Sequence, residues 1–168
     1  MKKIGLFYGS TTGNAENVAN IIADKIGREK VEIFNVADID IAELQNFDNL
    51  ILGTSTWGFG DLQDDWEVLL TDLEELDLSG KNVALFAVGN SQSNSDSFCG
   101  SMSHLNNAIK ENGPKIIEGV SVEGYSFDES DSVIDGMFVG LAIDEDNESD
   151  LTESRVDNWL KKVLPNFS

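Results

Sequence analysis

The chain is poor in the residue types from which catalytic and metal sites are commonly built. Its 168 residues include one cysteine, Cys99, and one histidine, His104. A single cysteine cannot form an internal disulfide, and one cysteine with one histidine cannot make a zinc site. Proline occurs only twice, and no repeat or low-complexity linker interrupts the chain. We therefore expect a single compact domain over residues 1–168, with no metal site.

Basic residues are also scarce. Lys and Arg together number 11 against 31 Asp and Glu, which gives a formal net charge of -20. That charge opposes binding to nucleic acid backbones and to anionic membrane surfaces. No apolar run is long enough for a membrane span or for the core of a signal peptide. We expect a cytoplasmic protein that binds neither nucleic acid nor membrane.

What is present is an alternation of apolar strands and amphipathic helices. Continuous apolar runs are typical of strands buried on both faces of a parallel sheet, and they occur at Ile4–Tyr8, Leu50–Gly53 and Val83–Val88, with a weaker strand at Val31–Val36. Helical spacing of apolar residues is found at Ala15–Ile26, Trp66–Leu76, Phe98–Ile109 and Val156–Val163. This order predicts a doubly wound α/β domain with its ligand at the carboxyl ends of the strands.

A loop without lysine or arginine, Gly9 to Glu16, follows the first strand and opens into a helix. Its small residues allow close backbone approach, and the free N–H groups of a helix N-terminus attract an anion. The lysine of nucleoside triphosphatases and the Gly-x-Gly-x-x-Gly run of dinucleotide sites are both missing. The loop therefore indicates either a plain helix N-cap, for which Ser, Thr and Asn are usual, or a site for a monophosphate.

Two further loops follow the third and fourth strands. The loop after Gly53 carries Trp57 among small residues, where the indole could stack on a flat ring or could instead cover the local core. The loop from Gly89 to Gly100 is polar and can hydrogen-bond the edge of a heterocycle, although alone it would pass for an ordinary surface loop.

In order and register, these loops resemble those of flavodoxins, carriers of flavin mononucleotide (FMN). The resemblance runs from Lys3 to Phe167 and rests on Gly9–Ala15, Ser55–Gly58, Asp61–Trp66, Ser97–Gly100 and Phe138–Asn147. It implies a flavodoxin-like sandwich, a five-stranded parallel sheet with helices on both faces. The tract Ser121–Gly140, between β stretches at Lys115–Val120 and Leu141–Ile143, resembles the insertion that interrupts the fifth strand in the long-chain subgroup.

The resemblance also assigns the FMN site. The first loop would hold the phosphate, the Trp57 loop one flavin face and its reactive edge, the loop after Gly89 the other face, and Asp144 or Asp146 the ribityl chain. The residues assigned are Ser10, Thr11, Thr12, Gly13, Asn14, Ala15, Ser55, Thr56, Trp57, Gly58, Phe59, Gly60, Gly89, Asn90, Gln92, Asn94 and Asp146. Two positions depart from the family: Asn94 or Ser95 stands where a tyrosine is common, and Asn90 replaces the usual acid after Gly89.

The function implied is that of a low-potential one-electron carrier, not an enzyme. Non-covalently bound FMN would cycle between semiquinone and hydroquinone to pass electrons between redox enzymes. Glycine at position 58 accepts a positive φ, so its peptide could turn its carbonyl towards the protonated flavin N5. Two alternatives remain open: an FMN-dependent quinone or azo reductase, and a dedicated flavodoxin-like assembly factor.

The expected partners are redox proteins with basic surfaces, namely a reductase as donor and low-potential acceptor enzymes, and the carrier itself is expected to be a monomer. Eight acids and no base occur between Asp61 and Asp77. They form either an ordinary solvated helix face or a surface that steers basic partners towards the flavin edge.

Overall fold

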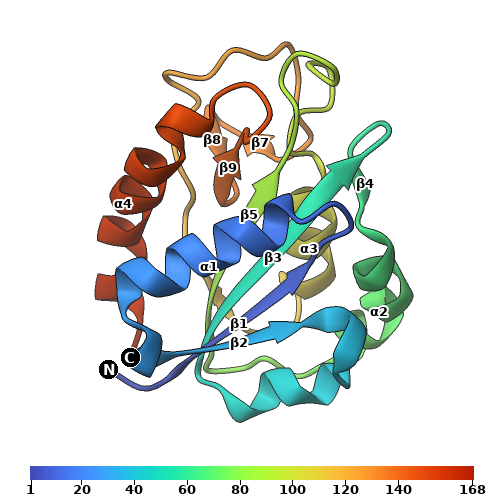
Figure 1. The fold of residues 1–168 in the computed structure, drawn as a ribbon. Helices are drawn as coiled ribbons and strands as arrows, with labels where there is room; N and C mark the ends of the chain where they lie inside the picture. The colour runs from blue at the N-terminus through green and yellow to red at the C-terminus, as the bar shows by residue number, and fades with distance from the viewer.

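The computed structural model describes residues 1–168, and its centre is a parallel sheet (Figure 1). The strand order is β2-β1-β3-β5, followed by β6 and β9, which both pair with β5. These strands are β1 (Ile4–Gly9), β2 (Val31–Asn35), β3 (Asn49–Trp57), β5 (Asn82–Val88), β6 (Lys115–Ile116) and β9 (Leu141–Ile143). Because the order changes direction between β1 and β3, the ligand-binding crevice of this fold class lies at the carboxyl ends of those strands.

Helices cover both faces of the sheet. The four α-helices are α1 (Asn14–Ile26), α2 (Asp64–Glu75), α3 (Ser101–Ile109) and α4 (Thr152–Val163), and the short 3-10 turns are Arg28–Lys30, Val36–Asp38, Ile41–Asn46, Ser149–Leu151 and Leu164–Asn166. Alternate strand residues face opposite sides: Leu6 packs in a core with Trp159 of α4, whereas Phe7 packs in a core with Trp66 of α2. The predicted doubly wound sandwich is confirmed. None of these helices combines the length and apolar composition that crossing a bilayer requires.

The fifth strand is interrupted, as predicted. Strand β6 pairs with the start of β5, and β9 pairs with its end, from Phe86 to Val88. Between them the chain forms the antiparallel pair β7 (Val133–Ile134) and β8 (Met137–Phe138). Aromatic rings of this inserted segment pack on Phe98, the nearest being Phe127 with its ring centroid at 5.5 Å. Membership of the long-chain subgroup stays a prediction.

Three predicted boundaries are wrong. The β stretch expected over Lys115–Val120 ends at Ile116. The third strand does not end at Gly53 but continues to Trp57. Glycine is required inside this strand because a Cβ there would lie 1.9 Å from Cζ of Phe86. The third helical segment does not begin at Phe98, because the insertion holds that residue: its N–H donates to the carbonyl of Glu129 (3.2 Å). Helix α3 starts only at Ser101.

Candidate functional site

The carboxyl ends of β1, β3 and β5 meet at one edge of the sheet, beside the amino end of α1 (Figure 1). A cavity of about 180 Å³ opens at this edge. It is lined by Thr12, Asn14, Ser55, Thr56, Trp57, Gly58, Val88, Gly89, Asn90, Asn94 and Asp146. All three predicted loops contribute to this lining, and no lysine or arginine is part of it.

The first loop presents unpaired backbone donors. Gly13 has a φ of 98°, in the left-handed region that favours glycine, and its N–H donates to Oγ of Ser10 (3.2 Å). Five neighbouring backbone N–H groups have no acceptor within the protein, those of Thr11, Thr12, Asn14, Ala15 and Glu16. Together with the positive end of the α1 dipole, these N–H groups can bind an anion without any cationic side chain.

The buried side chain of Gln63 fixes the first loop from outside. Its Nε2 donates to Oγ1 of Thr11 (3.2 Å), while its Oε1 accepts from the backbone N–H groups of Asp65 and Trp66 at the start of α2. A Cβ on Gly9 would lie 2.3 Å from that same Oε1, which explains the glycine there. Sequence reasoning missed this role of Gln63, although its position before the acid-rich first turn of α2 is that of an N-cap.

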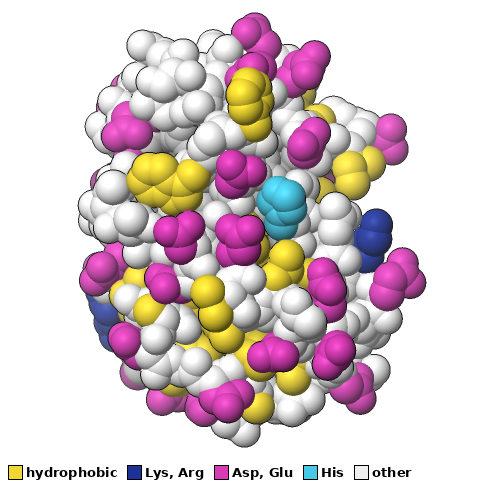
Figure 2. All heavy atoms as spheres, turned by 90° about the vertical axis from the view of Figure 1, so that its right-hand side faces the viewer, with side chains coloured by type: hydrophobic (Ala, Val, Ile, Leu, Met, Phe, Trp, Pro, Cys, Tyr) yellow, Lys and Arg dark blue, Asp and Glu magenta, His cyan; other side chains and the backbone are white.

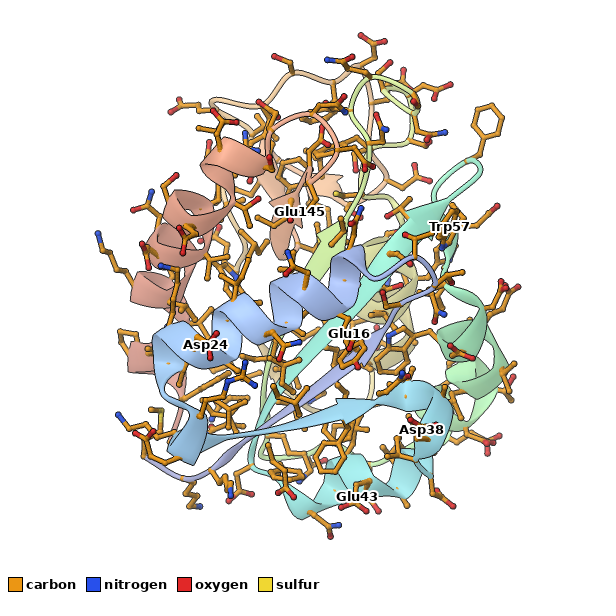
Figure 3. All side chains as sticks on the ribbon, in the orientation of Figure 1. Glu16, Asp24, Asp38, Glu43, Trp57 and Glu145 are labelled. Carbon is orange, nitrogen blue, oxygen red and sulfur yellow. The ribbon has the colours of Figure 1, made fainter.

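Trp57 ends β3 and stands at the edge of the cavity (Figure 3). The side chain is 39% exposed, belongs to none of the core clusters, and donates its Nε1–H to Oγ of Ser55 (3.0 Å). The chain then turns through Gly58 to Gly60, both with positive φ, into the short strand β4 (Asp61–Leu62). Trp57 therefore does not cover the core, and an aromatic face is available for stacking.

The third wall follows β5 and is shaped by a buried carboxylate. Asp144 accepts hydrogen bonds from the N–H of Ser91 (3.1 Å) and from the N–H of Asn147 (3.0 Å). Burial raises the pKa of Asp144, but the hydrogen bonds from Ser91 and Asn147 outweigh it and hold the pKa below its usual value. Asn147 in turn donates its Nδ2–H to Oδ1 of Asn90 (2.7 Å). Asp144 thus supports the wall without lining the cavity.

Asp146, in the acidic segment that follows β9, lines the cavity. Its carboxylate accepts from Nδ2 of Asn14 and from Nδ2 of Asn90, both at 3.4 Å. The neighbouring Glu145 accepts from Nδ2 of Asn17 on α1 (2.9 Å; Figure 3). The segment after β9 therefore joins the first loop to the loop after β5.

The structure does not bring every predicted residue to the cavity wall. Seven lie beside it without lining it: Ser10, Thr11, Gly13, Ala15, Phe59, Gly60 and Gln92. Phe59 is 81% exposed at the tip of the hairpin that β3 and β4 form. Sequence reasoning also missed two residues. Val88 lines the cavity, and the signal that could have found it is its place at the end of a buried strand. Ser97 supports the turn after β3, because its hydroxyl donates to the carbonyl of Gly58 (3.4 Å).

A larger cleft of about 410 Å³ lies between the insertion and α4. Arg155 lines it, with the guanidinium 3.9 Å from the ring centroid of Tyr125. That guanidinium already donates to Glu148 (3.3 Å) and to the carbonyl of Gly124 (3.1 Å). The charge of Arg155 is thus compensated, and the other cation of the cleft, Lys162, donates its Nζ–H to the carbonyl of Gly119 (3.1 Å). The first loop differs from this cleft in offering several backbone N–H groups without any acceptor.

The two chemically distinctive side chains outside the cavity have ordinary roles. Cys99 is fully buried, and burial raises the pKa of its thiol, so no reactive thiolate forms there. His104 is exposed on α3, and a ring nitrogen lies 3.1 Å from the carbonyl oxygen of Gly60. Neither side chain lines the cavity.

Comparisons with known proteins agree with this geometry. Residues 6–159 match the family model described as Flavodoxin. A flavodoxin of Picosynechococcus is 44% identical over 168 residues, covering 99% of both chains, and one of Nostoc is 41% identical over 166 residues, covering 99% of this chain and 98% of its own. The crystal structure of Fusobacterium nucleatum flavodoxin bound to flavin mononucleotide superimposes with a TM-score of 0.95 at 34% identity, covering 100% of both chains.

Proposed function

The chain belongs to the flavodoxin family and is an FMN-dependent electron carrier, and we propose that it holds its FMN in the cavity between Trp57 and Asn90. FMN supplies the redox chemistry, and the protein supplies binding, orientation and electrostatics. In this proposal the whole chain, residues 1–168, acts as one flavin-binding domain.

The observation that carries the assignment is the set of five unpaired N–H groups in the first loop. A phosphate offers oxygen acceptors, and hydrogen bonds to a charged acceptor are shorter and stronger than neutral ones. The loop residues proposed to hold the phosphate are Ser10, Thr11, Thr12, Gly13, Asn14 and Ala15. Since no lysine or arginine lines the cavity, backbone N–H groups and hydroxyls carry the whole of this interaction.

The remaining walls fit a flat heterocycle on a polyhydroxyl chain. Trp57 provides the stacking face, and the loop with Gly89, Asn90 and Asn94 provides polar groups for the ring edge. The Asp146 carboxylate is an acceptor suited to chain hydroxyls. A pocket for a small molecule usually measures about 300 to 1,000 Å³, which is more than the volume of this cavity. In this proposal FMN therefore extends beyond the cavity along the first loop.

The charge of the protein favours a low reduction potential. A net charge of -20 raises the energy of any negative charge added to the bound ring. With no cation in the cavity wall to offset this field, electron uptake becomes harder and the reduced carrier becomes a stronger donor.

We propose that partner proteins dock against the acidic side of the site. Asp64, Glu67 and other acids of α2 are exposed just after the Trp57 hairpin, and Figure 2 shows acids spread over this face with few basic side chains. Basic-surfaced partners, a reductase as donor and low-potential enzymes as acceptors, complement such a surface. A monomeric state and a cytoplasmic location complete the proposal.

Titration of the protein with FMN and with riboflavin, which lacks the phosphate, tests the assignment. We expect one FMN per chain, and we expect Thr12→Val to weaken FMN binding by roughly tenfold to a hundredfold, because it removes a hydrogen bond to a charged group. Riboflavin binding should not change. Thr71→Val, an exposed threonine on α2, is the matched control. Equal losses for both ligands would contradict a phosphate site at Thr12.

A further inference from the structure

Two side chains converge on the carbonyl oxygen of Gly58. Nδ2 of Asn94 donates to it at 3.2 Å, and the hydroxyl of Ser97 donates to it at 3.4 Å. A carbonyl oxygen has two lone pairs, and both are used by these donors. A third donor from inside the cavity would have to displace one of the two.

The backbones of Asn94 and Gly58, which this hydrogen bond joins, differ in how tightly they are held. The backbone of Asn94 is braced, since its N–H donates to the carbonyl of Asn90 (3.0 Å) and its carbonyl accepts from the N–H of Ser97 (3.2 Å). Gly58 lies at an exposed turn with a φ of 51°, where glycine has more backbone freedom than any other residue. The braced side chain therefore restricts the orientation of the Gly58 peptide.

We propose that Asn94 is a positioning residue that fixes the Gly58 carbonyl and thereby makes the first electron step of the bound flavin harder. This inference rests on the proposed FMN site, whose cavity both residues line. When the ring takes one electron from a donor protein, it becomes more basic and takes one proton from water, so that a ring N–H donor appears with no net change of charge. That donor competes with Asn94 for the Gly58 oxygen.

The contact itself is tested on the protein without FMN. In Asn94→Ala, the ¹³C resonance of the Gly58 carbonyl should move in the direction of a lost hydrogen bond. Asn107→Ala, which removes an exposed amide from α3, is the control and should leave the resonance in place. An unchanged Gly58 resonance in a folded Asn94→Ala protein would overturn the proposal, whether or not FMN binds.

The consequence is tested on the FMN-loaded protein by measuring the two one-electron steps separately. In Asn94→Ala, the equilibrium constant of the first step should rise about fivefold, the equivalent of one ordinary hydrogen bond, with a smaller change in the second. Asn94→Gln, which keeps an amide donor, should restore the first step towards the wild-type value.

Two outcomes separate this inference from the proposed function. A first step that is the same in Asn94→Ala and wild type, or a glutamine variant that behaves like alanine, would overturn the role of Asn94 and leave the FMN site intact. Failure of the wild-type protein to bind FMN would overturn the proposed site and, with it, the effect on the flavin. The carbonyl resonance would still decide the contact between Asn94 and Gly58.

Discussion

The buried carboxylate of Asp144 joins Ser91 across 53 positions of the chain by accepting from both its backbone N–H and its hydroxyl. Ser91 follows the end of β5, and Asp144 follows the end of β9. Asn147 donates to the same carboxylate and to Oδ1 of Asn90. One ionised group thus holds together the loop that forms the Asn90 side of the FMN cavity.

Replacing this carboxylate by an amide should destabilise the protein at neutral pH. Asp144→Asn removes charge-assisted hydrogen bonds and should lower the free energy of unfolding by about 2 kcal/mol, measured by urea denaturation at pH 7. The exposed Asp150→Asn is the matched control and should change this free energy by less than about 0.5 kcal/mol.

The pH dependence of the Asp144 contribution follows from the direction of its pKa. The native pKa lies below the value of about 3.9 of an unfolded aspartate, so the contribution is present above that pH and is lost as pH falls through the native pKa. The stability difference between wild type and Asp144→Asn should therefore shrink in acid. A difference that stays constant down to strongly acidic pH would contradict this role.

Removal of the Trp57 ring should weaken FMN binding and increase the fluorescence of bound flavin, which a stacked indole quenches. An aromatic pair contributes roughly 0.5 to 1.5 kcal/mol beyond the area that it covers, so Trp57→Ala should raise the Kd for FMN about tenfold. Trp57→Phe keeps a ring and should lose less affinity. If all three proteins had the same Kd and the same flavin fluorescence, Trp57 would not contact the ring.

Salt should strengthen FMN binding, the reverse of what a cationic phosphate site would show. FMN is an anion that approaches a protein of net charge -20 through a cavity without lysine or arginine. Raising the ionic strength from about 0.01 M to 0.1 M shortens the screening length from about 30 Å to about 10 Å and reduces the repulsion. Titrations at both salt concentrations should show a lower Kd for FMN at the higher one and no such change for riboflavin. A weaker complex at high salt would indicate a cation at the phosphate.

Electron transfer to a basic partner should show the opposite dependence and slow as salt rises. The acids at the start of α2 attract such a partner, and salt screens that attraction. Neutralising Asp64, Asp65 and Glu67 together should flatten the dependence in stopped-flow measurements. Glu29→Gln, Glu32→Gln and Glu111→Gln, three exposed acids away from the hairpin, form a control of equal charge. If both triple variants slowed transfer equally, the α2 acids would have no special part in docking.

The sequence alone was sufficient to predict the fold, because its strands and helices have clear patterns. Continuous apolar runs identified β1 and β5. The helices were identified by apolar residues that recur at helical spacing. The end of β3 could not be predicted, because a glycine such as Gly53 usually indicates a turn. In the structure Gly53 lies within the strand, and the ring of Phe86 occupies the space that a side chain there would need. The local pattern carries no information about such contacts between strands.

The candidate site was predicted only as far as its loops. Thr12, Trp57 and Asn90 belong to three segments that were predicted as loops at the strand ends, and all three residues line the cavity, although Trp57 is the last residue of β3. The supports of these loops could not be predicted: Gln63 reaches Thr11 across 52 positions, and Ser97 reaches Gly58 across 39. These contacts depend on tertiary packing, and no spacing in the sequence signals them.

Backbone amide chemical shifts, measured by ¹⁵N NMR as FMN or riboflavin is added, test the central claim most directly. We predict that FMN shifts the N–H resonances of Thr11, Thr12, Asn14, Ala15 and Glu16 downfield, as new hydrogen bonds to an anion require, and that riboflavin shifts those around Trp57 and Asn90 but not these five. Unchanged resonances in the first loop, or FMN-dependent shifts centred on Arg155 in the larger cleft, would contradict a phosphate held by unpaired N–H groups at the start of α1.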